Sequence, residues 1–291
     1  MRKLALIINP SAGGGRAGQT LRGVQVALHR HGLEHHVERT QSLAHARELA
    51  REATAAGEVA VAFGGDGLVG AIADALKHTE GVLGVLPGGR GNDFARGLGI
   101  PPDPSAACQV LTDGVVRALD IGEAGSRTFV GIASCGCDSD ANRIANRNRW
   151  IRGNLVYTYG ALGALARWRP ATFSVELDGA QTRTFTGYTV AAANSKAYGG
   201  GMMLAPGASL QDGVLDVVMI GQMHKLRLLA ILPTVFKGWH VNRREVEVVR
   251  AREVRVSADR PFTVYADGDP IARLPVTIRT LARAVQVIVP A

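Results

Sequence analysis

Three short apolar runs near the start of the chain each end at a cluster of glycines, and helix-like segments lie between them. The runs cover residues 4–8, 59–63 and 82–86. Segments with apolar residues at helical spacing follow, at residues 20–31, 44–55 and 72–76, with a strand-like stretch at 35–38. Because strands that alternate with helices form parallel sheets, we predict an α/β domain with flanking helices and with ligands at the carboxyl ends of its strands.

The pattern changes after Asp120, where short strand-like segments bounded by Gly, Pro or Asp turns predominate. They cover residues 128–134, 173–177, 184–193, 215–220, 246–249, 253–256, 262–266, 276–279 and 285–289. So many short strands predict an antiparallel sandwich or barrel, interrupted by two helical insertions near 154–168 and 224–239. A chain of 291 residues is long enough for two domains. We expect the first to cover residues 1–122 and the second, β-rich domain to cover residues 123–291.

The charge and the apolar stretches limit the partners and the location of the protein. The chain has 33 Lys and Arg against 25 Asp and Glu, and the net charge of +8 favours nucleotides, nucleic acid or an anionic membrane surface. No apolar stretch is long enough to span a bilayer, and the first ends at Asn9-Pro10, too early for a signal peptide. Three cysteines, Cys108, Cys135 and Cys137, imply no disulfide framework and fit a reducing cytoplasm. Cys135-Gly136-Cys137 lacks the further ligands of a zinc site, which favours two small buried residues there.

The first glycine cluster matches a dinucleotide-binding fingerprint. Gly13-Gly14-Gly15-Arg16-Ala17-Gly18 has the spacing GxGxxG after a strand, and Glu38 lies about 20 residues further, where such folds place a ribose-binding carboxylate. However, Asn9-Pro10-Ser11-Ala12 separates the strand from the glycines, whereas the fingerprint begins at the strand end. An NAD- or NADP-binding site and a flexible Gly-rich loop therefore stay as alternatives.

The other two glycine loops predict a phosphate-binding site more strongly. In Phe63-Gly64-Gly65-Asp66-Gly67-Leu68, paired glycines at a strand end let backbone N–H groups approach a phosphate, and the next helix offers its positive N-terminus. Asp66 would either bind Mg²⁺ on the phosphates or hold the loop by internal hydrogen bonds. Leu86-Pro87-Gly88-Gly89-Arg90-Gly91-Asn92-Asp93 repeats the pattern with Arg90 as a candidate phosphate ligand. Glycine loops at three successive strand ends favour a nucleotide site, and the missing Walker-A sequence excludes a P-loop NTPase.

These motifs also resemble a known family. Asn9-Pro10-Ser11-Ala12-Gly13, Gly64-Gly65-Asp66-Gly67 and the 86–93 loop are similar to the nucleotide-binding motifs of the diacylglycerol kinase and sphingosine kinase superfamily. The second half resembles the bacterial soluble lipid kinases of that family at residues 194–202, 205–208 and 212–216, and at Asp267-Gly268-Asp269. The resemblance covers almost the whole chain, with the motifs in order.

The resemblance implies an NAD-kinase-like nucleotide domain, a C-terminal β-sandwich domain, and a cleft between them in which ATP meets a lipid hydroxyl, most simply that of diacylglycerol. It implies Asp269 as the proton acceptor, and Mg²⁺ on the Asp212 carboxylate with the backbone carbonyls of Ser209 and Val214. Without the resemblance, Asp212-Gly213 and Asp267-Gly268-Asp269-Pro270 would both be interpreted as turns. The residues that it implies for ATP are Asn9, Pro10, Ser11, Ala12, Gly13, Thr40, Gly64, Gly65, Asp66, Gly67, Leu68, Val69, Gly70 and Arg90.

The sequence departs from the family pattern at three positions. Leu68 and Arg90 stand where the family has threonine, and Asp269 stands where it has glutamate. Leu68 cannot donate a hydrogen bond to a phosphate, whereas the charge of Arg90 could offset lost hydroxyl contacts. A catalytically weak or inactive kinase homologue that binds nucleotide or lipid therefore stays an alternative to an active enzyme.

A basic and aromatic segment gives a candidate membrane contact. Between Arg143 and Arg169 there is no acidic residue, and an apolar stretch is flanked by Arg147, Arg149, Trp150, Arg152, Tyr157, Tyr159, Arg167 and Trp168. Such a segment suits an anionic interface, and a solvated basic face over a core helix is the alternative. We expect a cytoplasmic protein, peripheral at the inner membrane face, that binds no nucleic acid because no such module is present. A homodimer is left open.

Overall fold

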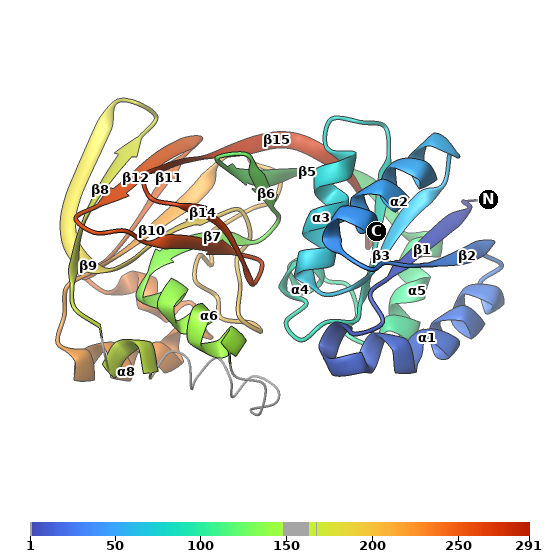
Figure 1. Cartoon of the computed structure of the whole chain (residues 1–291), viewed down its shortest axis with the longest axis horizontal. Coiled ribbons are helices and arrows are strands. Elements are labelled where there is room, and N and C mark those ends of the chain that lie inside the picture. Colours follow the sequence, from blue (N-terminus) through green and yellow to red (C-terminus); the bar gives the residue numbers. More distant parts are fainter. Residues whose placement is uncertain (1, 148–162, 167) are drawn as a thin grey trace. The chain divides into compact units, whose positions relative to one another are not determined.

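The computed structural model describes residues 2–147, 163–166 and 168–291. The chain forms two compact units, Met1–Asp120 with Arg283–Ala291, and Ile121–Ala282 (Figure 1). The sequence-based boundary assigned residues 283–291 to the second domain, whereas in the structure they join the first unit. The reason is pairing that sequence periodicity does not encode: the end of the last strand, β15 (Val276–Val289), lies parallel to β4 (Val82–Pro87), with Gln286 opposite Val82.

The first unit contains the predicted parallel sheet. Its strand order is β2-β1-β3-β4-β15, and all four neighbouring pairs are parallel. Every residue of β1 (Leu4–Ile8) and β3 (Val59–Gly64) is buried, as expected for central strands covered on both faces. The edge strand β2 (His35–Arg39) is half exposed and polar. β5 (Val115–Ala124) leads from this unit into the second.

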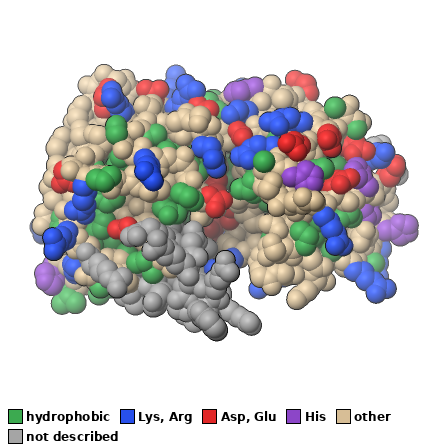
Figure 2. Space-filling view, in the orientation of Figure 1, with side chains coloured by type: hydrophobic (Ala, Val, Ile, Leu, Met, Phe, Trp, Pro, Cys, Tyr) green, Lys and Arg blue, Asp and Glu red, His purple; other side chains and the backbone are tan. Residues whose placement is uncertain are grey.

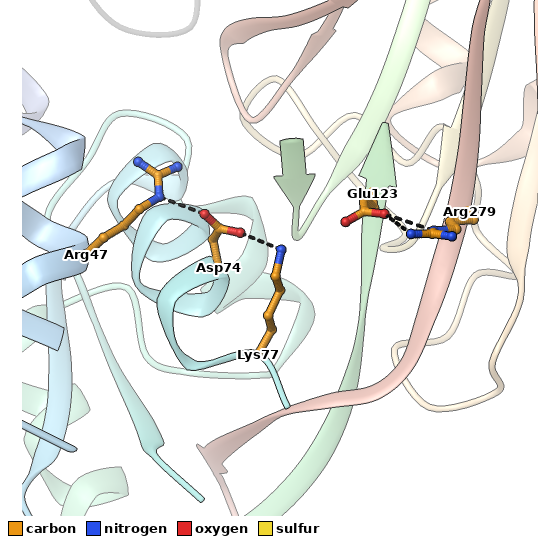
Figure 3. Close-up of polar contacts among 5 residues, drawn as sticks. All are labelled: Arg47, Asp74, Lys77, Glu123 and Arg279. Carbon is orange, nitrogen blue, oxygen red and sulfur yellow. Dashed lines mark hydrogen bonds and ion pairs between the residues drawn. The ribbon is translucent and has the colours of Figure 1, made fainter. Parts of the chain in front are cut away.

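The helices of the first unit begin at residues that suit helix starts. Ser42 caps α2 (Leu43–Ala55) by accepting a hydrogen bond from the His45 N–H at 3.1 Å, and Asp103 caps α5 (Pro104–Asp113) by accepting one from Ala106 at 2.9 Å. The other helices are α1 (Ala12–Arg30), α3 (Asp66–Leu76) and the single turn α4 (Asp93–Gly97). α3 and α2 are linked by Asp74, which binds Arg47 at 2.7 Å and Lys77 of the next turn at 3.0 Å (Figure 3).

The second unit is built from antiparallel strands, as predicted. The order is β14-β13-β7-β9-β8-β12-β15, with β10 paired to β9 and β11. The core between them includes Phe173, Tyr188 and Trp168, whose side chains are buried. The strands are β6 (Arg127–Phe129), β7 (Ile132–Gly136), β8 (Ala171–Leu177), β9 (Gln181–Ala193), β10 (Leu215–Gly221), β11 (Val246–Ala251), β12 (Glu253–Ala258), β13 (Thr263–Ala266) and β14 (Asp269–Arg273).

Helical segments join these strands. α6 (Cys137–Arg147) follows β7, and α8 (Lys225–Val235) with the short helix η1 (Trp239–Asn242) follows β10, where the sequence predicted a helical insertion. The insertion predicted near 154–168 lies largely outside the described residues.

Among the described strands, Glu123 of β5 pairs with Arg279 of β15 at 2.8 Å (Figure 3). The three cysteines are buried and free, which confirms the burial predicted for Cys135 and Cys137.

Residues 128–134 form two strands and not the single one expected. β6 ends at Phe129, and β7 begins at Ile132. The intervening N–H groups of Val130 and Gly131 bind the Asp267 carboxylate at 2.8 and 2.9 Å and so do not join a strand ladder. A distant side chain has interrupted the strand, and this effect cannot be predicted from local periodicity.

Candidate active site

The first glycine loop packs against the third. Gly13 has a left-handed backbone with φ of 63°, and a Cβ there would lie 2.7 Å from the carbonyl oxygen of Gly88. Gly14 and Gly15 also have positive φ, so regular helix geometry in α1 starts only after them. A side chain at position 13 would therefore force the two loops apart. The contact brings the loops after β1 and β4 together at one edge of the sheet.

The second loop closes against the third even more tightly. The Gly88 N–H donates a hydrogen bond to the Gly64 carbonyl at 2.8 Å. A Cβ on Gly89 would overlap the Cα of Gly65. Paired glycines are thus required at both loops because their backbones touch. The three loops that the sequence placed at strand ends therefore pack together in the first unit.

Asp66 ties the second loop to the third through its side chain. Its carboxylate accepts hydrogen bonds from the backbone N–H groups of Phe94 at 3.0 Å and Asp93 at 3.2 Å, at the start of α4. Burial raises the pKa of Asp66, and these two donors oppose that rise. Of the two roles that the sequence allowed for Asp66, internal hydrogen bonding is the one these contacts display.

Asn9 and Thr40 arrange the loop that follows β1. The Asn9 side chain accepts hydrogen bonds from the Ser11 N–H at 3.1 Å and the Ser11 hydroxyl at 2.7 Å. The Thr40 N–H binds the carbonyl of Ile8, the last residue of β1, at 2.9 Å. The Thr40 hydroxyl donates to the Ser42 carbonyl at 2.6 Å. Pro10 and Ala12 complete this half-exposed loop.

Arg90 and Leu68, two of the departures from the family pattern, have opposite environments. Arg90 is exposed in the loop between β4 and α4. Leu68 is buried, and its side chain packs against Gly64. Val69 and Gly70 are buried beside it, while Gly65 and Gly67 are half exposed. Leu68 is therefore a core residue that anchors α3, and its backbone is the part that lies near the loop surface.

The second unit separates the two aspartates of the Asp267-Gly268-Asp269 turn. Asp267 has a left-handed backbone with φ of 52°, and its carboxylate binds Val130 and Gly131 as described above. Asp269, at the start of β14, is exposed. Neighbouring protein atoms nevertheless desolvate its carboxyl in part and raise its pKa, while Arg127 opposes the rise. The accessible carboxylate with increased basicity is that of Asp269.

Asp212 lies in the exposed loop before β10. Its carboxylate accepts a hydrogen bond from the Val214 N–H at 3.3 Å, which closes a turn, and the Ser209 hydroxyl accepts one from Gln211 at 3.3 Å. Burial raises the pKa of nearby Asp216; Arg250, at 3.4 Å, opposes that rise, and the Asp212 charge adds to it. One carboxylate with backbone carbonyls is a hard-oxygen donor set of the kind Mg²⁺ prefers, and a cation would offset the repulsion between Asp212 and Asp216.

Most of the basic and aromatic segment at 143–169 lies outside the described residues or side chains. Trp168 is described, and its ring is buried in the core against Tyr188 and Phe262, with the Arg260 guanidinium over it. Trp168 is therefore not an interfacial side chain. It is a core residue, because its indole stacks inside the second unit.

Two asparagines with organising roles were missing from the sequence-based site. Asn92, with φ of 52°, binds the Gly89 N–H at 2.8 Å and its carbonyl at 3.2 Å. Asn194 is fully buried and donates to the Val130 carbonyl at 2.9 Å. Asn92 could have been found as an Asn that follows Gly in a turn. Asn194 begins the 194–202 segment that resembles the family, but its bond to Val130, far away in the chain, could not be predicted from the sequence.

Comparison with known proteins agrees with this geometry. The model of the diacylglycerol kinase catalytic domain matches residues 3–124, and that of the YegS C-terminal NAD kinase beta sandwich-like domain matches residues 131–289. A diacylglycerol kinase of Mycobacterium tuberculosis (strain ATCC 25618 / H37Rv) is 37% identical over 99% of this chain and 95% of its own length. The chain belongs to the diacylglycerol kinase family. It is thus a lipid kinase, an enzyme that uses ATP and a lipid substrate.

Other members extend the comparison. A diacylglycerol kinase of Bacillus subtilis (strain 168) is 28% identical over 100% of this chain and 97% of its own length. The crystal structure of a diacylglycerol kinase from Bacillus anthracis str. Sterne has a TM-score of 0.75 at 20% identity, and covers 99% of this chain and 97% of that one. The fold predicted for both halves of this lipid kinase is thereby confirmed.

Proposed function

We propose that this lipid kinase transfers the γ-phosphate of ATP to the hydroxyl of diacylglycerol and so makes phosphatidic acid. The observation that carries the proposal is the packing of three glycine loops in the first unit, where Gly13 lies against Gly88 and Asp66 joins the second loop to the third. Phosphoryl transfer needs mainly positioning and charge neutralisation, and exposed loop backbone supplies N–H donors for phosphate oxygens. Diacylglycerol is chosen as the acceptor because the relatives at 37% and 28% identity are named diacylglycerol kinases.

In this proposal, the nucleotide is held by the loops after β1 and β3, by Thr40 and by Arg90. The glycine backbones let the phosphates approach closely, and Asp66 keeps the loops after β3 and β4 in one arrangement. The exposed Arg90 guanidinium neutralises phosphate charge, a role that a threonine at this position could fill only by a neutral hydrogen bond. Leu68 contributes through packing alone.

Asp269 is the proposed proton acceptor. As the lipid oxygen forms its bond to the γ-phosphorus, the bond from that phosphorus to the bridging oxygen breaks and ADP leaves. The proton of the lipid hydroxyl moves to an Asp269 carboxylate oxygen. Partial desolvation raises the pKa of Asp269, which makes its carboxylate a better base than a fully solvated aspartate.

Magnesium is proposed at Asp212 with the carbonyls of Ser209 and Val214. There the ion would supply positive charge that stabilises the loop before β10, next to the Asp216 carboxylate. We further propose that the enzyme acts at an anionic membrane surface on the cytoplasmic side, since its substrate is a lipid and its net charge is +8. A homodimer stays a prediction, which the mass of the purified protein in solution tests.

The test is phosphorylation of a lipid panel by the full chain with γ-labelled ATP in mixed micelles. The panel contains diacylglycerol, monoacylglycerol, ceramide and sphingosine. We expect label in phosphatidic acid to exceed the label in any other product about tenfold or more, and Asp269→Asn to remove most of it. Dominant labelling of another lipid would overturn the choice of substrate. Absence of any labelled lipid, with ATP binding intact, would favour the inactive homologue.

A further inference from the structure

The second unit exposes a group of large hydrophobic side chains around α8 and η1. Leu226, Phe236 and Trp239 are 69%, 53% and 58% exposed. Among the residues that the structure describes, the other exposed large hydrophobic side chains are all valines, Val26, Val115, Val116 and Val248. Aromatic and leucine side chains of this size are normally buried, so their grouping on one short segment indicates a contact surface.

The spacing of these residues places them along one side of α8. Leu226, Ala230, Pro233 and Phe236 are exposed at intervals of three or four residues, whereas Leu228, Ile231 and Val235 are buried on the opposite side. Exposed Arg227 and Lys237 border the apolar side chains. We call the exposed residues Leu226, Arg227, Ala230, Pro233, Phe236, Lys237, Trp239 and Arg243 of this segment the α8 face. An exposed side that is apolar with basic borders is typical of a helix lying in a membrane interface.

The charge of this segment has one sign. From Gln222 to Arg244 there is no Asp or Glu, and the segment contains Lys225, Arg227, Lys237, Arg243 and Arg244. Lys237 lies 4.6 Å from the Trp239 ring centroid, so an ammonium group stands directly beside the largest exposed ring. At the lower left of Figure 2, in the region where Figure 1 shows α8, hydrophobic side chains lie beside Lys or Arg and His side chains. No described helix is long and apolar enough to span a membrane.

We propose that the α8 face is the surface by which this enzyme docks on an anionic membrane, an inference that rests on the proposed phosphorylation of a membrane lipid. Leu226, Phe236 and Trp239 would enter the headgroup region, and Lys237, Arg227 and Arg243 would contact lipid phosphates. Apolar burial and electrostatic attraction then act together, which is the usual requirement for stable interfacial binding.

Charge favours a membrane over a second copy of the chain. In a symmetric contact of this face with itself, Lys237 would approach its own counterpart and Arg227 would lie near other cations. The nearest acidic residue, Glu245, is already bound by Arg227 and Arg244 at 3.0 Å each. An anionic lipid surface complements the same cations without such repulsion.

The test measures sedimentation of the full chain with vesicles of phosphatidylcholine plus phosphatidylglycerol, and with phosphatidylcholine alone. Phe236→Ser with Trp239→Ser removes the apolar anchors, and Lys237→Glu with Arg243→Glu reverses the charge. We expect each pair to weaken binding to the anionic vesicles about tenfold or more. The charge pair should also reduce the sensitivity of binding to salt. Activity on a water-soluble short-chain diacylglycerol should be unchanged.

Matched controls lie on the first unit. Val115→Ser with Val116→Ser removes exposed apolar side chains, and Arg30→Glu with Arg51→Glu makes the same change in net charge. Vesicle binding that is equal in the α8 variants and the wild type would overturn the proposal. So would loss of a dimer with vesicle binding kept, since the face would then be a subunit interface. If vesicle binding follows the α8 face but no diacylglycerol is phosphorylated, the docking surface stands and the proposed substrate does not.

Discussion

The Asp66 carboxylate accepts a hydrogen bond from the Phe94 N–H at 3.0 Å, across 28 positions of sequence. A carboxylate in the proposed phosphate-binding loop would repel phosphate if its charge faced the ligand. Here the charge is directed to the first N–H groups of α4, including that of Asp93 at 3.2 Å. The carboxylate, which could repel phosphate, therefore links the loops after β3 and β4 by hydrogen bonds.

Replacing Asp66 with Ala should abolish ATP-dependent lipid phosphorylation and leave the fold intact. Two N–H groups at the start of α4 lose their acceptor, which typically costs about 1–3 kcal/mol for each buried group. Turnover and melting temperature measure the two effects. Asp74→Ala is the control in the same helix, because it breaks the ion pairs to Arg47 and Lys77 away from the glycine loops. Near-normal turnover of Asp66→Ala would show that the hydrogen bonds of Asp66 to the start of α4 are dispensable for activity.

Substituting Asp269 with Asn should lower turnover by about 10²–10⁴-fold, the usual effect of losing a general base, with ATP binding unchanged. Asp269→Glu, the residue usual in the family, should keep measurable activity. Because partial desolvation raises the pKa of Asp269, wild-type turnover should fall as the pH drops through that raised value. A pH–rate profile of both proteins measures this. Normal turnover of Asp269→Asn with an inactive Asp267→Asn would assign the base to Asp267.

Asp267→Asn serves as the structural comparison. The Asp267 carboxylate accepts hydrogen bonds from the N–H groups of Val130 and Gly131, between β6 and β7. Because Asp267→Asn weakens these bonds, this variant should melt at a lower temperature than Asp269→Asn. Equal melting temperatures of the two variants would contradict the structural role of Asp267.

A threonine at position 68 should not increase activity. The Leu68 side chain is buried against Gly64, so Leu68→Thr loses apolar contacts and buries a hydroxyl, at a cost of about 1–3 kcal/mol. Melting temperature and turnover with diacylglycerol check this. A clear rise in turnover would mean that side chain 68 reaches the phosphates.

The Asp212→Ala variant should lose most of the stabilisation that Mg²⁺ gives in the absence of nucleotide. The carboxylate is the only charged ligand of the proposed set, and its loss also relieves repulsion of Asp216. Thermal shifts with and without Mg²⁺, and ATP affinity, are the measurements. The ATP affinity should change less than the Mg²⁺-dependent thermal shift. Identical thermal shifts in wild type and Asp212→Ala would contradict a magnesium site at Asp212.

Asp138, at the start of α6, should make stability depend on pH. Burial raises the pKa of its carboxyl to about 6, although Ser139 donates to it at 2.9 Å. The folded state binds this proton more tightly than the unfolded state, so protonation of Asp138 stabilises the fold. This contribution to the free energy of unfolding is at most about 3 kcal/mol; it is complete below pH 4 and is lost as the pH rises through 6. Melting temperatures of wild type and Asp138→Asn from pH 4 to 8 should therefore diverge, the variant gaining relative stability at high pH. Asp113→Asn, at the end of α5, controls for removal of a carboxyl, and parallel curves would contradict the prediction.

The strand-and-helix order of the first unit, the antiparallel second unit and the three glycine loops could all be predicted from the sequence. These follow from apolar periodicity and from glycines at strand ends, which are local properties of the chain. The sequence also showed Leu68, Arg90 and Asp269 as unusual for the family. It did not show that Leu68 faces the core, because a side chain one turn into a helix can be directed either way until the helix packs.

Contacts between distant groups became apparent only in the folded structure. The Asp66 carboxylate reaches Phe94 because β3 and β4 are neighbours, and Asp267 reaches Val130 across 137 positions and interrupts a strand there. The last residues return to the first unit because Gln286 pairs in parallel with Val82. Such contacts depend on which strands become adjacent when the chain closes long loops, and local periodicity carries no information on that choice.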